Sequence, residues 1–564
     1  MRHNPALIRL FRACKLAPAF SALWFAFGCF AAEAPAPLWT PYDESAELAE
    51  QAGHGNPRMR FQLINSRVLD KNTLWRPFEE ELAAFPAARY QALLPLILEQ
   101  DIASLQRSVI EQKFNYEELV LFYLYRIRAI ESDNARSLNA ILAVNPEALA
   151  DARRRDQQRL AGEVSIDDDS LFGMPVLLKD NIGADGMATT AGALALRNNR
   201  TGNAFITARL IESGAVVLGK ANLSEWAYFF CDDCPLGYSA IGGQTLNPYG
   251  RRRIESGGSS SGSAVAVAAN LAVAAVGTET SGSILSPASA NAVVGLKPST
   301  GMLSRTGIIP LAGSLDSPGP VARNVADAVR LFNAMSGFDQ RDRAMPLLSA
   351  DASLQLRQVP LGEFRLGELE SLAQNGQYRA ATTALADAGA RMTNVAMPTF
   401  SASGFDRLLA AEMDRDLSNY LRQMAADEVA ARSVDDILLF NSEAPSLRAP
   451  YGQALFDLMV DLQIGAEDEA LLRNRLRDSA RELLESVFVE GQLDILLSIN
   501  NLHAAVAALA NYPAMTIPIG LTEDGRPTGL TLIAPSFAEQ TLVDAALQVE
   551  RVLAPRVPPR DYQR

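Results

Sequence analysis

Short apolar runs bounded by glycine or proline alternate along the chain with longer amphipathic stretches, and this alternation constrains the fold most. Four runs have the length and residue types of buried strands: 173–178, 215–218, 514–519 and 528–533. Three stretches carry apolar side chains at helical spacing: 407–426, 467–490 and 539–553. Strands at both ends of the core with helices between them predict one large α/β domain, which no convincing linker or internal repeat divides.

Two further segments complete the predicted organisation. Residues 101–162 are predicted to form surface helices packed on something larger, and residues 264–276 a fully buried helix that runs towards a strand. The segment 240–320 is rich in Gly, Ser, Thr and Pro without being of low complexity. Because such residues allow close backbone approach and unusual dihedral angles, this segment is the first candidate for a reactive site.

The charge and the histidine count exclude several classes of protein. The formal net charge is −14 and the isoelectric point is near 5.0, which argues against a nucleic-acid partner bound through a basic surface. His3, His54 and His503 are the only histidines among 564 residues, too few for a His-rich metal site. We therefore predict no His-rich metal site, and acid–base chemistry that does not depend on imidazole.

The N-terminus has the pattern of a secretory signal peptide over residues 1–31. Basic residues from Arg2 to Lys15 precede an apolar run at 16–32, with small residues near Ala31. A retained membrane anchor is the alternative, but an apolar run of this length with a proline inside it is marginal for a span. Acylation of Cys29 as a lipoprotein is weaker still. We expect a periplasmic or secreted protein without stable membrane association after cleavage.

Two cysteines remain after the leader is removed. Cys231 and Cys234 have the spacing C-x-x-C within a loop-like segment that also contains Asp232, Asp233 and Pro235. A thioredoxin-like redox motif would open a helix, and a single pair of cysteines cannot build a zinc site. In an oxidising compartment the pattern favours a short structural disulfide.

Two motifs match known patterns without the context that those patterns need. Residues 214–221 approach a phosphate-binding loop, but Ala221 stands where a hydroxyl is required and the run has the pattern of a strand. Residues 258–262 satisfy G-x-S-x-G around Ser260, yet the segment 251–255 before them is not a buried strand. His503 lies in the correct chain order for such a triad, although we prefer a partly buried structural histidine.

Three elements remain that together could carry chemistry: Lys179 after an apolar run, the glycine- and serine-rich segment 257–262, and the segment 277–283. Ordered blocks surround them: G-M-P-V-L-L-K-D-N at 173–181, G-K-A-N-L-S-E-W at 219–226, G-G-Q-T-L-N-P-Y at 242–249, G-G-S-S-S-G-S-A at 257–264, G-T-E-T-S-G-S-I at 277–284, V-G-L-K-P-S at 294–299, S-L-D-S-P-G-P at 314–320 and N-Y-P-A-M-T-I-P at 511–518. From roughly residue 100 to 555 the chain thus resembles the amidase signature hydrolases, most closely the bacterial peptide amidase branch.

The resemblance implies both a fold and an activity. The fold would be a central twisted mixed sheet covered by helices on both faces, over residues 96–560, preceded by an N-terminal extension at 32–95. Residues 360–490 would form a variable helical region on the substrate side. The activity would be hydrolysis of carboxamide bonds in small-molecule or peptide amides, without a cofactor.

The resemblance also assigns roles to individual residues. Ser283 would be the acylated nucleophile, Ser259 the bridging serine after a cis peptide from Gly258, and Lys179 the base. The backbone N–H groups of Thr280, Ser281, Gly282 and Ser283 would form the oxyanion hole. A lysine pKa of about 10.4 must fall by roughly three units for a base that works near neutral pH. Burial behind residues 176–178 could supply that shift.

Two departures from the family bear on the substrate. Ser261 stands where relatives often have glycine, a change that the peptide amidase branch also tolerates. Leu285 replaces an arginine that many relatives carry two residues after the nucleophile. We therefore expect uncharged carboxamides with an apolar acyl side to be preferred, with Asn441 and Tyr451 as candidate polar contacts. Alternative functions are a periplasmic peptide-binding protein without catalysis and an amidotransferase-like relative.

Overall fold

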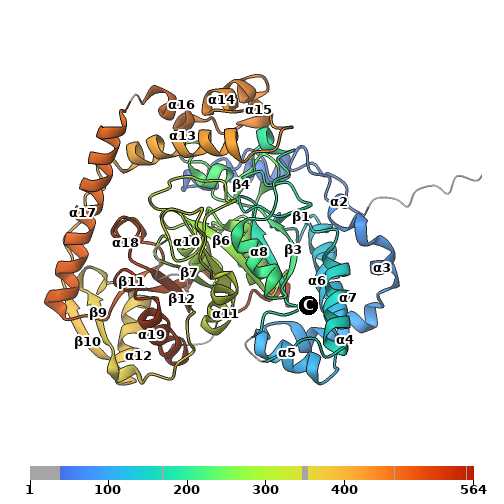
Figure 1. The fold of residues 1–564 in the computed structure, drawn as a ribbon, viewed down its shortest axis with the longest axis horizontal. Coiled ribbons are helices and arrows are strands. Elements are labelled where there is room, and N and C mark those ends of the chain that lie inside the picture. The colour runs from blue at the N-terminus through green and yellow to red at the C-terminus, as the bar shows by residue number, and fades with distance from the viewer. Residues whose placement is uncertain (1–37, 168–169, 346–352, 463, 554–555, 564) are drawn as a thin grey trace, which may run out of the picture. The chain divides into compact units, whose positions relative to one another are not determined.

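A mixed sheet of eleven strands runs through the centre of the molecule (Figure 1). Its strand order is β1-β3-β2-β6-β8-β7-β12-β13-β11-β9-β10. The strands are β1 Ile141–Val144, β2 Pro175–Lys179, β3 Val216–Ala221, β6 Ala274–Glu279, β7 Val294–Lys297, β8 Ser317–Ala322, β9 Arg365–Leu369, β10 Arg391–Val395, β11 Ile495–Ile499, β12 Ala514–Leu521 and β13 Pro527–Ile533. A separate short sheet pairs β4 Tyr238–Ser239 with β5 Gly243–Gln244.

The sheet combines parallel and antiparallel pairing. β2 pairs in parallel with β3 on one side and β6 on the other, and β9 pairs in parallel with β10 and β11. The remaining neighbours, β6 to β8, β8 to β7, β7 to β12, β12 to β13, β13 to β11 and β1 to β3, are antiparallel. β2 and β6 are therefore adjacent, so the ends of both strands open at the same edge.

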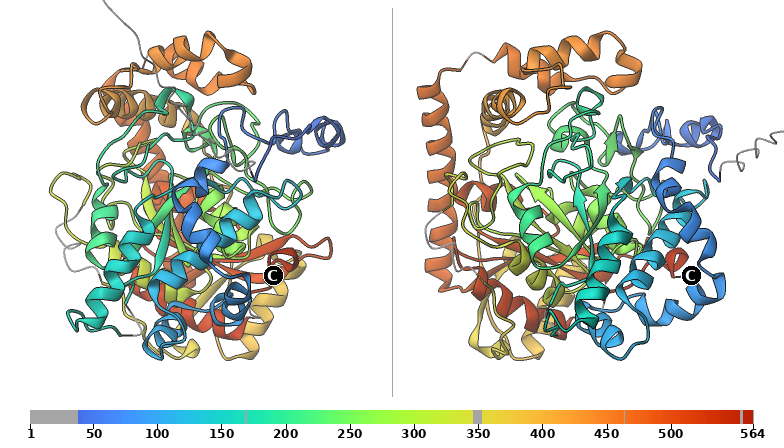
Figure 2. Two further views of the ribbon diagram at one scale, coloured as in Figure 1. Left: turned by 90° about the vertical axis from the view of Figure 1, so that its right-hand side faces the viewer. Right: turned by 45° about the vertical axis from the view of Figure 1, so that its right-hand side comes forward.

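Helices lie on both sides of this sheet (Figures 1 and 2), which confirms the predicted α/β fold. The helices are α1 Ser45–Gln51, α2 Asn72–Trp75, α3 Glu79–Ala84, α4 Ala87–Ile97, α5 Ile102–Ile110, α6 Tyr116–Glu131, α7 Ala148–Leu160, α8 Phe205–Glu212, α9 Ser261–Ala268, α10 Leu285–Ala290, α11 Val325–Met335, α12 Gly376–Asp387, α13 Phe405–Gln423, α14 Val434–Ser442, α15 Pro445–Arg448, α16 Ala454–Asp461, α17 Ala466–Gly491, α18 Ala504–Ala510 and α19 Glu539–Val552. The helix α9 is buried along its whole length and contacts β2, β3 and β6.

The computed structural model describes residues 38–167, 170–345, 353–462, 464–553 and 556–563. Trp39–Arg564 forms one compact unit that contains all the elements named above. The predicted signal peptide at 1–31 lies outside the described residues. Within them, no helix combines the length and apolar character that crossing a bilayer requires.

Three sequence predictions about local structure need correction. The helix α6 is not a surface helix, because eleven of its residues are buried and it packs against α2, α3, α4 and α7. Residues 141–144 form the edge strand β1 inside a stretch that the sequence predicts to be all helical. The region 360–490 likewise contains the strands β9 and β10 besides its helices. The strands β1 and β9 are mostly buried, whereas β10 is a largely exposed edge strand that pairs with β9.

Candidate active site

Lys179 is the last residue of β2 and is fully buried, with 0% of its surface exposed. Its Nζ lies 2.8 Å from the Ser259 hydroxyl oxygen, 3.0 Å from the Thr278 carbonyl oxygen and 2.8 Å from the Thr278 hydroxyl oxygen. Thr278 belongs to the neighbouring strand β6, and its hydroxyl also accepts a hydrogen bond from Asn181 Nδ2 at 3.0 Å. The adjacent strands β2 and β6 thus place the lysine directly beside the serine loop.

Burial lowers the pKa of Lys179 to about 7, since the charged ammonium loses its hydration there. The negative charges of Asp316 and Glu279 act in the opposite direction and raise the pKa, but they do not cancel the effect of burial. The lysine can therefore lose its proton near neutral pH, which matches the shift that the sequence argument required.

Ser259 lies two residues before the start of α9, and the peptide bond between Gly258 and Ser259 is cis. Its carbonyl oxygen accepts a hydrogen bond from the Ser224 N–H at 3.0 Å. The next residue, Ser260, donates its hydroxyl to the Thr278 carbonyl at 3.0 Å and accepts the Thr278 N–H at 3.2 Å. Because these strand contacts occupy the Ser260 side chain, the G-x-S-x-G interpretation has no structural support.

Ser283 lies in the turn between β6 and α10, and its surface is 9% exposed. Its carbonyl oxygen accepts the Ser260 N–H at 3.0 Å, which ties this turn to the serine loop. Within the described ranges, the Ser283 hydroxyl makes no hydrogen bond to protein, and it faces a pocket that also contains Gly258. Lys179, Ser259 and Ser283, predicted together from sequence, therefore meet at one end of β2 and β6.

Glu279 holds the turn that carries Ser283. Its carboxylate accepts the N–H groups of Gly282 at 2.7 Å, Ile284 at 2.7 Å and Leu285 at 2.9 Å. This corrects the prediction for Gly282, whose N–H is directed at Glu279 and not at a substrate. In the part of the chain that the structure describes, the N–H groups of Thr280, Ser281 and Ser283 have no protein acceptor. Gly282 instead supplies a left-handed conformation, with φ +83°.

The pocket in front of Ser283 has a volume of about 570 Å³. Apolar side chains, four charged residues and the serine turn line it: Arg58, Ala227, Tyr228, Phe229, Cys231, Asp232, Asp233, Leu236, Gly258, Thr280, Ser281, Gly282, Ser283, Ser286, Leu311, Phe405, Asp406, Leu409, Leu455 and Asn501. Contributions thus come from the N-terminal part of the chain, from the 228–236 loop and from α13 and α16. This pocket is large enough for a small peptide amide.

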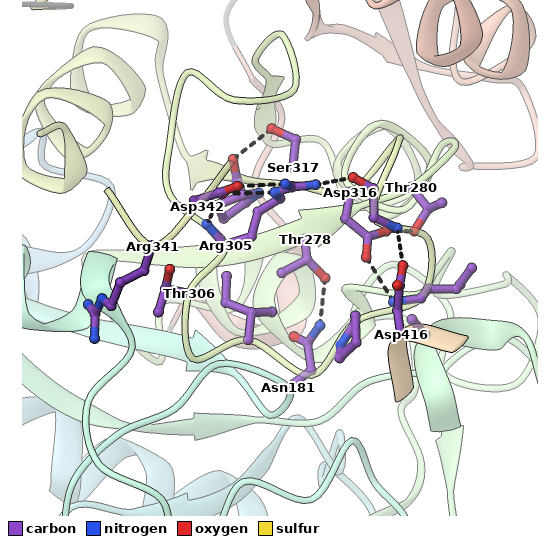
Figure 3. A pocket seen from close by; sticks show the side chains of 16 residues that line it. Asn181, Thr278, Thr280, Arg305, Thr306, Asp316, Ser317, Arg341, Asp342 and Asp416 are labelled. Atoms are coloured by element: carbon purple, nitrogen blue, oxygen red, sulfur yellow. Dashed lines mark hydrogen bonds and ion pairs between the residues drawn. The ribbon is translucent and has the colours of Figure 1, made fainter. Parts of the chain in front are cut away.

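A second cavity of about 250 Å³ adjoins the first, since Ala227, Thr280 and Leu311 line both (Figure 3). Asp316 lines this second cavity, and its carboxylate accepts the Thr280 hydroxyl at 2.5 Å and the Leu311 N–H at 2.8 Å. Burial raises the pKa of Asp316 to about 6, although these hydrogen bonds favour its ionised form. Asp316 is therefore a second titrating group beside Lys179.

Several predicted contacts lie elsewhere. Leu285 is buried in α10, 1% exposed, and does not line the pocket, so it cannot select substrates by contact. Asn441 donates to Gln453 at 3.0 Å, and the Tyr451 hydroxyl accepts the Gln62 N–H at 2.7 Å; neither residue lines the pocket. His503 is half-buried and bonded to Ser498 at 2.6 Å, as expected of a structural histidine.

The two remaining cysteines are joined. Cys231 and Cys234 form a disulfide, with their Cα atoms 5.7 Å apart, as the spacing favoured. Sequence reasoning did not anticipate that this loop lines the Ser283 pocket. The near-match to a phosphate-binding loop has no structural support either, because Lys220 is buried in β3 and pairs with Asp180 at 3.5 Å.

The sequence argument missed Thr278, Glu279 and Asp316, which orient the predicted residues. All three stand inside the blocks 277–284 and 314–320 that carried the family resemblance. The available signal was an acidic side chain within a short glycine- and serine-rich turn, where a buried carboxylate must accept backbone N–H groups. Among the described residues, no group of three or more His, Cys, Asp or Glu side chains is arranged to hold a metal ion.

Known proteins share this architecture. The Amidase family profile matches residues 118–498. A probable amidase of Arabidopsis thaliana is 35% identical over 482 residues, which cover 82% of this chain and 92% of that protein. One subunit of the glutamyl-tRNA(Gln) amidotransferase from Zymomonas mobilis is 31% identical over 469 residues, which cover 74% of this chain and 91% of that protein.

The comparison with solved structures points to the same family. An amidase family protein from Bacillus anthracis superposes with a TM-score of 0.82 at 34% identity, covering 88% of this chain and 99% of that one. The native peptide amidase of Stenotrophomonas maltophilia gives a TM-score of 0.76 at 38% identity, covering 83% and 99%. The predicted resemblance to the peptide amidase branch is therefore confirmed. The chain belongs to the amidase signature family and is an enzyme that hydrolyses amide bonds.

Proposed function

We propose that this enzyme hydrolyses carboxamide C–N bonds through an acyl-enzyme on Ser283, with Ser259 relaying a proton to Lys179. The observation that carries the proposal is the 2.8 Å hydrogen bond between Lys179 Nζ and the Ser259 hydroxyl, inside a site where burial lowers the lysine pKa to about 7. A neutral lysine beside a serine is a base, and no imidazole lies in the pocket lining.

The acylation step follows from these positions. The Ser283 oxygen attacks the carboxamide carbon as its proton passes to Ser259, whose own proton passes to Lys179. The carbonyl oxygen gains negative charge, which the N–H groups of Thr280, Ser281 and Ser283 stabilise; one such donor typically contributes roughly 10²–10³ in rate. The C–N bond then breaks, and the leaving amine takes a proton from Ser259, which Lys179 reprotonates.

Deacylation repeats the sequence with water as the nucleophile. Water adds to the ester carbonyl while its proton passes through Ser259 to Lys179. The bond between the carbonyl carbon and the Ser283 oxygen then breaks, and the serine recovers its proton. The products are a carboxylic acid and an amine or ammonia, and the enzyme returns to its initial protonation state.

The substrate that we propose is a small-molecule or peptide amide, and the compartment is the periplasm or the cell exterior. The pocket volume of about 570 Å³ and the similarity to a peptide amidase support this substrate class. The leader-like pattern at 1–31 and the disulfide between Cys231 and Cys234 support export. The net charge of −14 argues against a partner nucleic acid bound through a basic surface.

The second candidate is a component of an amidotransferase, which the 31% identity to the Zymomonas mobilis protein favours. An amide panel separates the two. We expect the purified enzyme alone to release ammonia from primary carboxamides and larger amines from substituted ones, without tRNA or any partner protein. Release of ammonia only from glutamine, and only with partner proteins present, would instead support the amidotransferase. A peptide-binding protein would turn over nothing.

A further inference from the structure

The rim of the Ser283 pocket carries more negative than positive charge. Three carboxylates, those of Asp232, Asp233 and Asp406, line it against one guanidinium, that of Arg58. Within the described ranges, no hydrogen bond or ion pair engages the three carboxylates. Asp232, Asp233 and Asp406 are exposed to solvent. Their charge is thus available to a molecule that enters the pocket.

The backbone that carries two of these carboxylates is held in place. Asp232 and Asp233 are the only residues between Cys231 and Cys234, so the disulfide closes the loop around them. The Tyr228 hydroxyl donates to the Cys234 carbonyl at 3.1 Å, and the Leu455 N–H of α16 donates to the Phe230 carbonyl at 3.2 Å. Asp233 has φ +52°, so the backbone turns sharply between the two cysteines.

The third carboxylate lies on a different element. Asp406 is in the first turn of α13, beside Phe405 and Leu409, which give the same pocket an apolar wall. A helix N-terminus attracts negative charge, so the first turn of α13 is a favourable place for an acidic side chain. Acidic groups from a loop and a helix therefore line the same pocket as the proposed nucleophile Ser283.

We propose that this acidic rim, formed by Asp232, Asp233 and Asp406, selects amides that carry a positive charge close to the scissile carboxamide. Suitable groups are the free α-amino group of a short peptide amide and the side chain of a lysine or arginine. The inference rests on the proposed function, because it concerns which amides reach Ser283. Carboxylates that lack a protein partner gain an ion pair with such a substrate, whereas an anionic substrate is repelled.

The test compares two amides that differ in one charge. N-acetyl-lysinamide and N-acetyl-norleucinamide have similar size, and the readout is the ratio of their kcat/KM values. We expect the lysine amide to be favoured about three- to tenfold at low salt, since exposed ion pairs are individually weak. The ratio should fall towards one between about 0.02 M and about 0.5 M NaCl, as screening shortens the reach of the charges.

Substitutions of the three aspartates test whether the acidic rim causes this preference. The double variant Asp232→Asn/Asp233→Asn should lower the ratio about threefold, and Asp406→Asn should lower it further. The whole protein is acidic, so a matched control removes exposed acids outside the pocket: Glu363→Gln/Asp387→Asn, near β9 and β10, should leave the ratio unchanged. The charge-reversed double variant Asp232→Lys/Asp233→Lys should make N-acetyl-norleucinamide the better substrate.

Two outcomes would overturn the inference. Equal kcat/KM values for the two amides in the wild-type enzyme would show that the rim does not select charge. A preference that survives the three aspartate substitutions, or that falls equally in the control, would place its origin elsewhere. Failure to hydrolyse either amide, or any of the broader panel, would contradict the proposed function itself.

Discussion

The Thr280 hydroxyl donates a 2.5 Å hydrogen bond to the carboxylate of Asp316, a half-buried residue whose charge acts on Lys179. The same carboxylate accepts the N–H groups of Leu311 at 2.8 Å and Ala312 at 3.0 Å. Its negative charge raises the pKa of Lys179 and partly offsets burial. Asp316 therefore acts on both the turn that would hold the oxyanion and the group that would accept the proton.

The first prediction concerns this pair of titrating groups. Lys179 must be neutral to accept a proton, so kcat/KM should rise with pH through the lysine pKa of about 7. Asp316→Asn removes a negative charge that raises that pKa, so the midpoint should move to lower pH. The measurement is the pH profile of kcat/KM for a neutral amide.

Asp416→Asn provides the matched control for that profile. Asp416 lines the same second cavity and accepts the Gly313 N–H at 2.8 Å (Figure 3), but its charge does not act on Lys179. This variant should keep the wild-type midpoint. An unchanged or raised midpoint in Asp316→Asn would contradict the assignment of Lys179 as the base.

The second prediction separates the proposed catalytic residues from His503. Ser283→Ala should abolish hydrolysis, while Lys179→Ala and Ser259→Ala should each lower kcat by several powers of ten, because each interrupts the proton relay. His503→Ala should retain most activity, since His503 contacts Ser498 outside the pocket. If His503→Ala were as inactive as Ser283→Ala, the lysine mechanism would be wrong.

The third prediction concerns Leu285. An arginine at this position would favour substrates with a carboxylate only if its side chain lined the pocket. Leu285 packs inside α10 instead. Leu285→Arg should therefore bury a charge without a partner and destabilise the protein by several kcal/mol. Thermal unfolding measures this, with Leu285→Met as a control of similar volume that should cost less than about 1.5 kcal/mol. A folded arginine variant that turns over half-amides better than the wild type would make this position a substrate contact after all.

The fourth prediction concerns the disulfide. Replacing Cys231 and Cys234 by serine opens a four-residue loop, and closing such a loop is worth about 2 kcal/mol by its entropy. The Tm should fall by a few degrees, while kcat for a neutral amide should stay within about twofold, because neither sulfur takes part in the proton relay. A loss of kcat greater than tenfold, in protein that remains folded, would assign the sulfurs a catalytic role.

The strands with purely apolar runs were predictable, and β8 shows why others were not. Its sequence contains Pro318 and Pro320, which argue against a strand inside a sheet. Yet its ladder with β7 covers only Val321 and Ala322, so the prolines lie where β7 requires no hydrogen bond. This placement depends on how far β7 extends, which no local pattern reveals.

The candidate site likewise has one part that the sequence predicted and another part that it did not. Lys179, Ser259 and Ser283 stand in ordered blocks, so their sequence context was sufficient to select them. Arg58 and Asp406 lie 225 and 123 residues from Ser283 in sequence and reach the pocket only through the tertiary fold. The family resemblance predicted Gly282 as an oxyanion donor, but its N–H donates to the Glu279 carboxylate instead.

The parallel pairing of β2 with β6 has a consequence for how such an enzyme can change. Lys179 and the turn with Ser283 come from two adjacent strands in the core, whereas the residues at the mouth come from Arg58, the 231–234 loop and α13. The outer segments can accept insertions and exchanges without moving the strands. New substrate preferences could therefore be acquired, or grafted by design, one peripheral segment at a time while the reaction itself is inherited unchanged.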